Sequence, residues 1–226
     1  MNYINEAVDL HRKIIFVAIP KTGTTSIRKQ LQQTGKPLIK APHLNIVQIR
    51  QAINLFFQIR QLGTNKAYPS ANVKSCSDIQ LESDSFFNNS FKFSSVRNPW
   101  ERAVSLYSRK EGIQLKSKIS FREFIEQHFY ASDTCVIPTL HKNQYDWLCD
   151  EKGSMLADYV FKLENFREAL PEIDKRSMGR LKLKELQENK NPLSHSERYR
   201  EFYNDQTKNL IAKRFEKDID YFKFSF

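Results

Sequence analysis

The most constraining feature of the sequence is a short apolar run that ends at a glycine-containing turn. Residues 13–19, KIIFVAI, are almost all β-branched, aromatic or otherwise apolar, as expected for a strand buried on both faces. Pro20 and Gly23 interrupt this run. A helical pattern follows, and Thr24 or Thr25 can cap its start. A strand, a turn and a helix in this order begin a parallel α/β unit.

The rest of the chain continues the alternation of strand and helix patterns. Residues 91–96 form a second buried run, and Asn98 and Pro99 behind it are a typical N-cap and first residue of a helix. Ser120 and Glu123 have the spacing of a capping box. The other expected elements are a short strand at 36–41, helices at 45–62 and 120–130, a strand at 159–164 followed by a helix, a helical tail at 196–217, and loops at 63–85 and 131–150. The pattern predicts an α/β fold with a central, mainly parallel sheet flanked by helices.

The composition is consistent with one packed domain over residues 1–226. Hydrophobic residues make up 40% of the 226 residues and aromatic residues 12%, which is enough apolar surface for a core. No apolar run approaches the roughly 20 residues that span a bilayer. The N-terminus lacks the charged and apolar regions of a secretory signal. We therefore expect a cytoplasmic protein without a membrane span.

Cysteine and charge content narrow the classes of function. The odd count of 3 cysteines, without a secretory signal, argues against a disulfide framework. The cysteines show no CxxC spacing, which argues against a zinc site, so we expect no metal. Lys and Arg number 36 against 26 Asp and Glu, and the resulting net charge of +10 attracts anions of any kind. The basic residues are spread along the chain without a run of five or more. This disfavours the alternative of a nucleic-acid-binding module, which rests on the charge alone.

The turn at residues 20–26, PKTGTTS, has the composition of an anion-binding site. A turn between a buried strand and a helix directs backbone N–H groups and the positive end of the helix at one point. Gly23 permits close backbone approach, Lys21 adds a mobile charge, and the hydroxyls add donors. In the nucleoside-triphosphate loop, GxxxxGK[ST], the lysine follows the second glycine, whereas Lys21 precedes the glycine here. A P-loop-like kinase is therefore disfavoured, and an ordinary glycine turn is the structural alternative.

A second basic motif follows the expected strand at 91–96. Arg97 lies at the end of that strand, so its guanidinium can reach across the same edge of the sheet as the turn, and arginine favours bidentate contacts with phosphate. Ser105 lies on the following helix and can donate a hydroxyl to the same phosphate. For Arg97 alone, a structural salt bridge is the alternative. Ligands of open α/β sheets bind at the carboxyl ends of the strands, where both motifs are expected.

Together the two motifs resemble the nucleotide-binding elements of sulfotransferases that use 3′-phosphoadenosine 5′-phosphosulfate (PAPS). The sequence VRNPWER at 96–102, followed by Ser105 and Tyr107, is similar to the corresponding motif of the carbohydrate branch. This branch includes the heparan 2-O and chondroitin enzymes and bacterial relatives. Weaker similarities lie at 158–165 and 215–222. The resemblance implies a P-loop-like fold and PAPS as the donor. It implies a saccharide hydroxyl as the acceptor, with a small secondary metabolite as the alternative. The animal enzymes of this branch carry an N-terminal membrane anchor, which is not seen in this sequence, so we expect a soluble member of bacterial type.

The resemblance also implies a role for each motif residue. Lys21 would contact the bridging oxygen and the 5′-phosphate, and Arg97 and Ser105 would hold the 3′-phosphate. The residues that would cradle the 5′-phosphosulfate are Thr22, Gly23, Thr24, Thr25 and Ser26. Insertions around residues 45–90 and 110–150 would shape the acceptor site.

Transfer to an alcohol also needs a base for the acceptor's proton. Among the 5 histidines, we favour His43, which follows the expected strand at 36–41 and so lies at the same edge as Lys21. It also resembles the histidine base of the 2-O branch; a histidine that packs or caps at a helix start is the alternative. His141 is the second candidate, in a stretch similar to the acceptor-side loop of that branch, where it would contact the acceptor. Other branches use a glutamate, which leaves an acidic base open.

Overall fold

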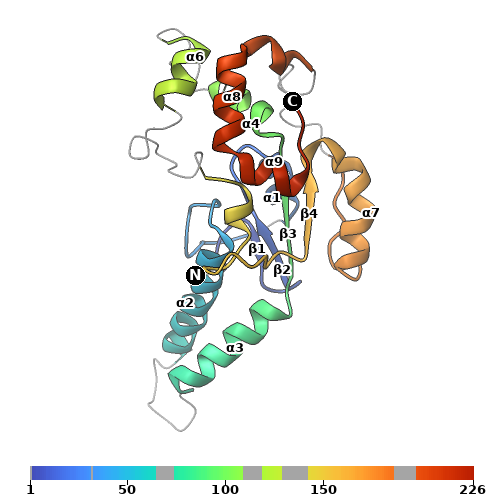
Figure 1. Cartoon of the computed structure of the whole chain (residues 1–226). Coiled ribbons are helices and arrows are strands. Elements are labelled where there is room, and N and C mark those ends of the chain that lie inside the picture. The colour runs from blue at the N-terminus through green and yellow to red at the C-terminus, as the bar shows by residue number, and fades with distance from the viewer. Residues whose placement is uncertain (1, 32, 65–73, 109–118, 129–141, 186–196) are drawn as a thin grey trace.

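A mixed sheet forms the centre of the computed structural model, which describes residues 2–31, 33–64, 74–108, 119–128, 142–185 and 197–226. Within these residues the strands follow the spatial order β1-β2-β3-β4 (Figure 1). Their bounds are Val8–Asp9 for β1, Ile14–Val17 for β2, Phe91–Val96 for β3 and Tyr159–Lys162 for β4. β1 is antiparallel to β2, whereas β2, β3 and β4 are parallel to one another. The predicted α/β fold with a mainly parallel central sheet is confirmed.

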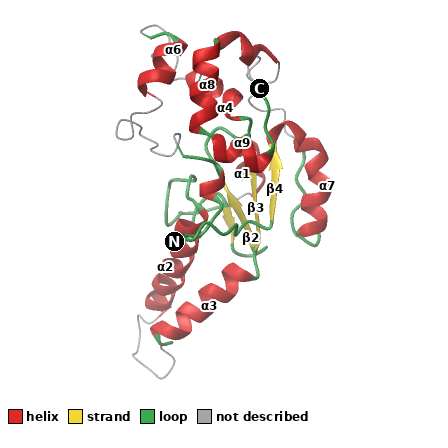
Figure 2. Ribbon diagram, viewed as in Figure 1, coloured by secondary structure: helices red, strands yellow, loops and turns green. Residues whose placement is uncertain are grey.

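Helices cover both faces of this sheet (Figure 2). The α-helices are α1 Thr24–Leu31, α2 Ile46–Thr64, α3 Cys76–Asn88, α4 Pro99–Tyr107, α6 Phe121–Glu123, α7 Phe166–Arg176, α8 Asp205–Arg214 and α9 Glu216–Phe222. Short 3-10 helices span Tyr145–Trp147, Leu163–Asn165 and Glu197–Phe202, and a π-helical turn spans Phe124–His128.

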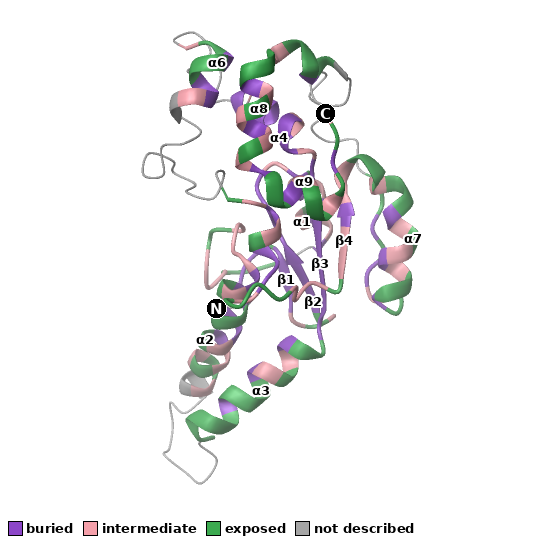
Figure 3. Cartoon of the chain, in the orientation of Figure 1, coloured by how far each residue is buried: buried purple, intermediate pink, exposed green. Residues whose placement is uncertain are grey.

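The strand side chains alternate between two hydrophobic clusters. Phe16 and Phe93 belong to the cluster that also contains buried residues of α1 and α7. Ile15, Val17 and Val96 belong to the cluster that contains residues of α2, α4 and α8. β1, β2 and β3 are accordingly buried along their whole length, whereas β4 is partly buried, as Figure 3 shows by their colour. This burial explains the nearly unbroken apolar run that marked β2 in the sequence.

The register places the carboxyl ends of the three parallel strands at one edge. Val17 pairs with Ser94, so β3 continues beyond the end of β2, and Val96 pairs with Lys162 at the end of β4. The turn that follows β2 therefore lies beside the last residues of β3. This edge is where the sequence motifs were expected to meet.

Several local signals are confirmed. β3 occupies residues 91–96 as expected. Asn98 caps α4, since its side chain accepts from the backbone N–H of Trp100, and Pro99 is the first helical residue. Ser120 and Glu123 form the expected capping box. Each signal depends only on neighbouring residues, which explains why the sequence alone sufficed.

Two local expectations are wrong. Residues 36–41 form no strand of the sheet. They lie beside the N-terminal segment, where Tyr3 and Pro37 form a single parallel bridge and Leu38 donates to the carbonyl oxygen of Tyr3. The expected loop at 63–85 contains most of α3, which begins with a capping box of Ser75 and Asp78. Within the expected loop at 131–150, residues 145–147 form a 3-10 helix. Residues 65–73 and 131–141 lie outside the described residues.

Helices α2 and α3 extend side by side beyond the amino end of β3, away from α4, α8 and α9 (Figure 1). They lie at the opposite end of the sheet from the two sequence motifs. Within the described residues, no helix combines the length and the apolar character needed to cross a bilayer.

Candidate anion-binding site at the carboxyl edge of the sheet

The turn after β2 reverses the chain through two residues with positive φ. Lys21 has a φ of 70° and Gly23 a φ of 77°. Lys21 adopts this left-handed conformation although it carries a side chain, which marks the turn as constrained. A Cβ on Gly23 would lie 2.5 Å from Cδ1 of Leu163, so glycine also allows a close approach. α1 begins at Thr24, so neither expected threonine cap precedes the helix.

Side chains hold four consecutive carbonyl oxygens of this turn. One donor comes from the turn itself, one from β3, one from α4 and one from Arg97, which lies between β3 and α4. The hydrogen bonds run from Thr22 Oγ1 to Ile19 O (2.9 Å), Arg102 Nε to Pro20 O (3.1 Å), Arg97 Nη1 to Lys21 O (3.3 Å) and Ser95 Oγ to Thr22 O (2.7 Å). Because these carbonyl oxygens all accept from protein donors, their partial negative charges point into the protein and not toward a bound anion.

The backbone N–H groups at the end of the turn are not engaged in the way that its carbonyl oxygens are. Among the residues that the structure describes, none accepts a hydrogen bond from the backbone N–H of Gly23, Thr24 or Thr25. The start of α1 adds the positive end of a helix dipole at the same point. A turn with engaged carbonyls and available N–H groups is suited to bind a phosphate or sulfate.

The hydroxyl groups of the turn divide into two kinds. Thr22 is fully buried, and its Oγ1 lies 3.0 Å from Ser95 Oγ, so this side chain shapes the turn from inside. Thr24 is 5% exposed. Thr25 and Ser26 are half-buried at the surface of the turn, as is Lys21. Only the last three expose side chains that could contact a ligand directly.

Arg97 joins the second motif to the turn. Its side chain is 5% exposed, and its Nη2 lies 2.8 Å from Glu101 Oε1, in addition to the bond to Lys21 O. Ser105 is 7% exposed and follows Glu101 by one turn of α4, so the two share a helix face. The structure thus brings both motifs to one edge, as expected. The salt bridge considered as the alternative for Arg97 is also present.

His43 lies at the same edge, beside the end of β2. Its Nδ1 is 2.7 Å from the carbonyl oxygen of Ala18. Since a carbonyl only accepts, Nδ1 carries the hydrogen, and the neutral ring keeps the lone pair on Nε2. Burial lowers the pKa of His43 below 6.5, and the charges of Arg28 and Lys21 lower this pKa further. The bond to Ala18 and the charge of Glu6 act in the opposite direction.

Arg102 is a further functional candidate. It belongs to the motif at 96–102, but the sequence alone assigned it no role. It is 1% exposed and forms no ion pair with any described residue, and its Nη2 has no hydrogen-bond partner. Burial lowers its pKa to about 10, while Asp218 raises it, so the guanidinium stays charged at neutral pH. A buried cation directly behind the turn favours an anion in front of it. No local pattern distinguished this arginine from a solvated one.

Glu164 is an acidic neighbour of the site. Partial removal of its carboxyl from solvent raises its pKa, and the charge of Glu101 raises this pKa further. Lys162 and Arg97 lower it. Glu164 therefore represents the acidic alternative to a histidine base at this edge. The second histidine candidate, His141, lies outside the described residues.

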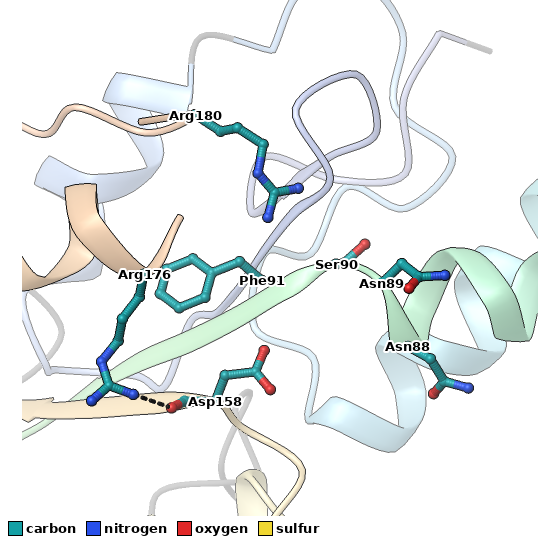
Figure 4. A pocket seen from close by; sticks show the side chains of 7 residues that line it. All are labelled: Asn88, Asn89, Ser90, Phe91, Asp158, Arg176 and Arg180. Carbon is teal, nitrogen blue, oxygen red and sulfur yellow. Dashed lines mark hydrogen bonds between the residues drawn. The ribbon is translucent and has the colours of Figure 1, made fainter. Parts of the chain in front are cut away.

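A separate hollow lies at the opposite edge of the sheet (Figure 4). It measures about 280 Å³, and its lining residues are Asn88, Asn89, Ser90, Phe91, Asp158, Arg176 and Arg180. Its charged groups already contact protein atoms: Asp158 lies 3.1 Å from Lys92 Nζ, and Arg180 donates to the carbonyls of Ser177 and Arg12. We therefore take the carboxyl edge as the candidate functional site. Across the described ranges, no three His, Cys, Asp or Glu residues gather as a metal site would require.

The fold and this edge define an α/β protein with a mainly parallel sheet, in which the turn after β2 and the arginine after β3 meet at the carboxyl ends of the strands. The chain belongs to the sulfotransferase family, whose family model matches residues 7–225 and so covers both motifs. No curated protein and no solved structure matches the chain significantly. The family resemblance inferred from the sequence is confirmed at the level of a sulfotransferase, and the protein is a transferase.

Proposed function

We propose that this sulfotransferase uses PAPS as its donor and transfers the sulfuryl group to a hydroxyl of a saccharide. The observation that carries the proposal is the hydrogen bond from Arg97 Nη1 to Lys21 O, which joins the turn and the second motif at one edge. PAPS carries a 5′-phosphosulfate and a 3′-phosphate on one nucleoside. A site with two linked anion-binding elements suits such a donor better than a ligand with a single phosphate.

The turn fits the 5′-phosphosulfate. The available N–H groups of Gly23, Thr24 and Thr25, together with the start of α1, would bind its oxygens. When bound, the donor supplies an activated sulfuryl group whose leaving group is the 5′-phosphate. Lys21 would neutralise the charge that grows on the leaving oxygen, and buried Arg102 would add positive potential from behind. Thr22 would contribute its backbone, because its hydroxyl is engaged inside the protein.

Arg97 and Ser105 fit the 3′-phosphate. Arg97 lies between β3 and α4, Ser105 lies within α4, and Glu101 of α4 pairs with the guanidinium of Arg97. A phosphate would compete with Glu101 for this guanidinium, and charge-assisted bidentate contacts favour the phosphate. The 3′-phosphate would thus bind to Arg97, whose guanidinium is already held in place by Glu101.

His43 would act as the base. Its Nδ1 hydrogen is committed to Ala18 O, so the free lone pair on Nε2 can accept the proton that the acceptor hydroxyl loses. The lowered pKa keeps the ring neutral, which is the active form, at neutral pH. The similarity of residues 96–102 to the motif of the carbohydrate branch favours a saccharide as the acceptor, with a small metabolite as the alternative. The single-domain organisation, the cytoplasmic location and the absence of a metal stay predictions.

Labelled PAPS and an acceptor screen test this proposal directly. We expect transfer of label to one or more saccharides without added Mg²⁺, and tighter binding of adenosine 3′,5′-bisphosphate than of AMP in calorimetry. Transfer only to small aglycones would assign the alternative acceptor class. Equal affinity for the bisphosphate and AMP, or no transfer from PAPS to any acceptor, would contradict the choice of donor. Binding of random DNA in place of the nucleotide would favour the nucleic-acid alternative.

A further inference from the structure

A buried glutamine holds the backbone of Arg97. Gln144 has no exposed surface, and its Oε1 accepts from the Arg97 N–H at 2.9 Å. Its Nε2 donates to the Arg97 carbonyl oxygen at 2.8 Å. The side chain of one residue therefore satisfies both backbone groups of another, 47 positions away.

This pairing extends the sheet where β3 has ended. The last residue of β3, Val96, pairs with Lys162 in β4, and Arg97 lies one residue beyond. There the amide of Gln144 takes the place of a neighbouring strand, because it offers one acceptor and one donor to the same residue. Only one orientation of the amide group satisfies both bonds, so the contact is specific.

A buried carboxylate holds the glutamine in turn. Asp218 of α9 has no exposed surface, and its Oδ2 accepts from the backbone N–H of Gln144 at 2.7 Å and from Gln144 Nε2 at 3.2 Å. Its Oδ1 accepts from the backbone N–H of Tyr145 at 2.9 Å. Burial raises the pKa of Asp218 above its ordinary value, and these hydrogen bonds and the charge of Arg102 offset only part of that rise. A chain of contacts therefore leads from α9 through Gln144 to Arg97.

We propose that Gln144 and Asp218 are positioning residues that set the guanidinium of Arg97 for recognition of the 3′-phosphate. The inference rests on the proposed function, because it assumes that Arg97 meets this phosphate. Arg97 lies between a strand and a helix, so a backbone shift there would carry its guanidinium away from both Glu101 and Lys21 O. Neither Gln144 nor Asp218 would touch the nucleotide itself, so both act through Arg97.

The effect of removing these contacts should be selective. Thr22, Ser95 and Arg102 still hold the turn before α1 when the Arg97 contact is weakened, so affinity for AMP should largely persist. Affinity for the bisphosphate depends on where Arg97 places its charge, so that affinity should fall. A residue with a purely structural role would weaken both ligands together or leave both unchanged.

The test compares Gln144→Met, Asp218→Asn and a control, Lys217→Ala. Lys217 precedes Asp218 on α9 and forms a surface ion pair with Asp146, so its loss leaves the buried contacts intact. Calorimetry on each variant gives the dissociation constants for adenosine 3′,5′-bisphosphate and for AMP. We expect a loss of about tenfold or more in bisphosphate affinity for Gln144→Met and Asp218→Asn, with AMP changed by less than about twofold. The control should match the wild type with both ligands.

AMP affinity also reports whether each variant is folded. Asp218→Asn preserves the shape of the side chain but removes its charge and one acceptor, whereas Gln144→Met removes the contacts to Arg97 without a change of charge. The proposal is overturned if the better-folded variant keeps the wild-type ratio of the two affinities, whether both fall in parallel or neither falls. If the wild type itself shows no preference for the bisphosphate, the proposed donor is wrong and the positioning role falls with it. If the wild type has the preference and the variants keep it, only the positioning role is wrong.

Discussion

Arg97 donates through Nη1 to the carbonyl oxygen of Lys21 at 3.3 Å, so the residue that follows β3 supports the residue that follows β2. The two motifs, separated by more than seventy positions, are thereby one structural unit. The same arginine pairs with Glu101 and is held by Gln144. A change at Arg97 should therefore affect the ligand at both ends of the site, but by different amounts.

Arg97→Lys retains the positive charge and loses the fork of donors. A single ammonium cannot pair with Glu101, support Lys21 O and meet a phosphate together. We expect affinity for adenosine 3′,5′-bisphosphate to fall about tenfold or more, and affinity for AMP to fall less, as measured by calorimetry. Arg50→Lys, at an exposed arginine paired with Asp84 near the other end of the molecule, is the control and should leave both affinities unchanged. Equal losses for the two nucleotides would show that Arg97 serves only the turn.

Lys21→Met tests the charge at the turn while keeping the length of the side chain. Negative charge builds on the leaving oxygen during transfer, so the ammonium matters more in the transition state than in the bound complex. We expect turnover to fall about 10²-fold or more, with a smaller loss of bisphosphate affinity. Steady-state kinetics with PAPS and calorimetry with the bisphosphate give the two numbers. Near-normal turnover would remove Lys21 from the reaction.

Gly23→Ala tests the geometry of the turn. The φ of 77° is unfavourable for alanine, and the new Cβ would meet Leu163 at 2.5 Å. We expect the free energy of unfolding to fall by about 1–3 kcal/mol in urea denaturation, and binding of the bisphosphate to weaken. Gly153→Ala is a matched control, since Gly153 has a φ of 84° and nothing within 4 Å of the added Cβ.

The two alanine variants separate backbone strain from contact. Gly153→Ala should show the backbone cost alone and leave nucleotide binding unchanged. The additional loss in Gly23→Ala then measures the contact with Leu163, part of which Leu163→Ala should restore. Equal stability losses with unchanged binding in both glycine variants would mean that the turn tolerates a side chain at Gly23.

The sequence predicted those parts of the site that depend on local chemistry and strand direction. The pattern of residues 91–96 set the bounds of β3, and Asn98 and Pro99 set the start of α4. Because parallel strands end at the same edge, the motifs at Lys21 and Arg97 could be placed together without knowledge of the contact between them.

Long-range contacts could not be predicted. Gln144 and Asp218 meet across 74 positions, and neither lies in a pattern that marks it as buried. A buried polar residue also explains why α3 was predicted as a loop. α3 buries Ile79, Ser83 and Phe87, and the serine interrupts the apolar spacing that would have indicated a helix. Tertiary packing decides such positions, and a single sequence does not report it.

The last prediction concerns His43 as the base. His43→Asn is the sharpest variant, because an asparagine amide can keep a donor near Ala18 O while removing the lone pair that Nε2 offers. We expect turnover to fall by about 10²–10⁴-fold, with bisphosphate affinity unchanged, since the base faces the acceptor. If turnover survives, Glu164 and His141 become the candidates, and Glu164→Gln tests the first of them.

The pH dependence of the wild-type rate provides an independent test of His43. The neutral ring is active, so the rate should rise with pH through the pKa of His43 and level off above it. Because burial and the charges of Arg28 and Lys21 lower this pKa, the acid limb should lie below pH 6.5. Arg28→Gln removes one of these charges and frees Glu6, which raises the pKa, so both effects should move the limb to higher pH. A limb that stays in place in Arg28→Gln, or that persists in His43→Asn, would assign the titration to another group.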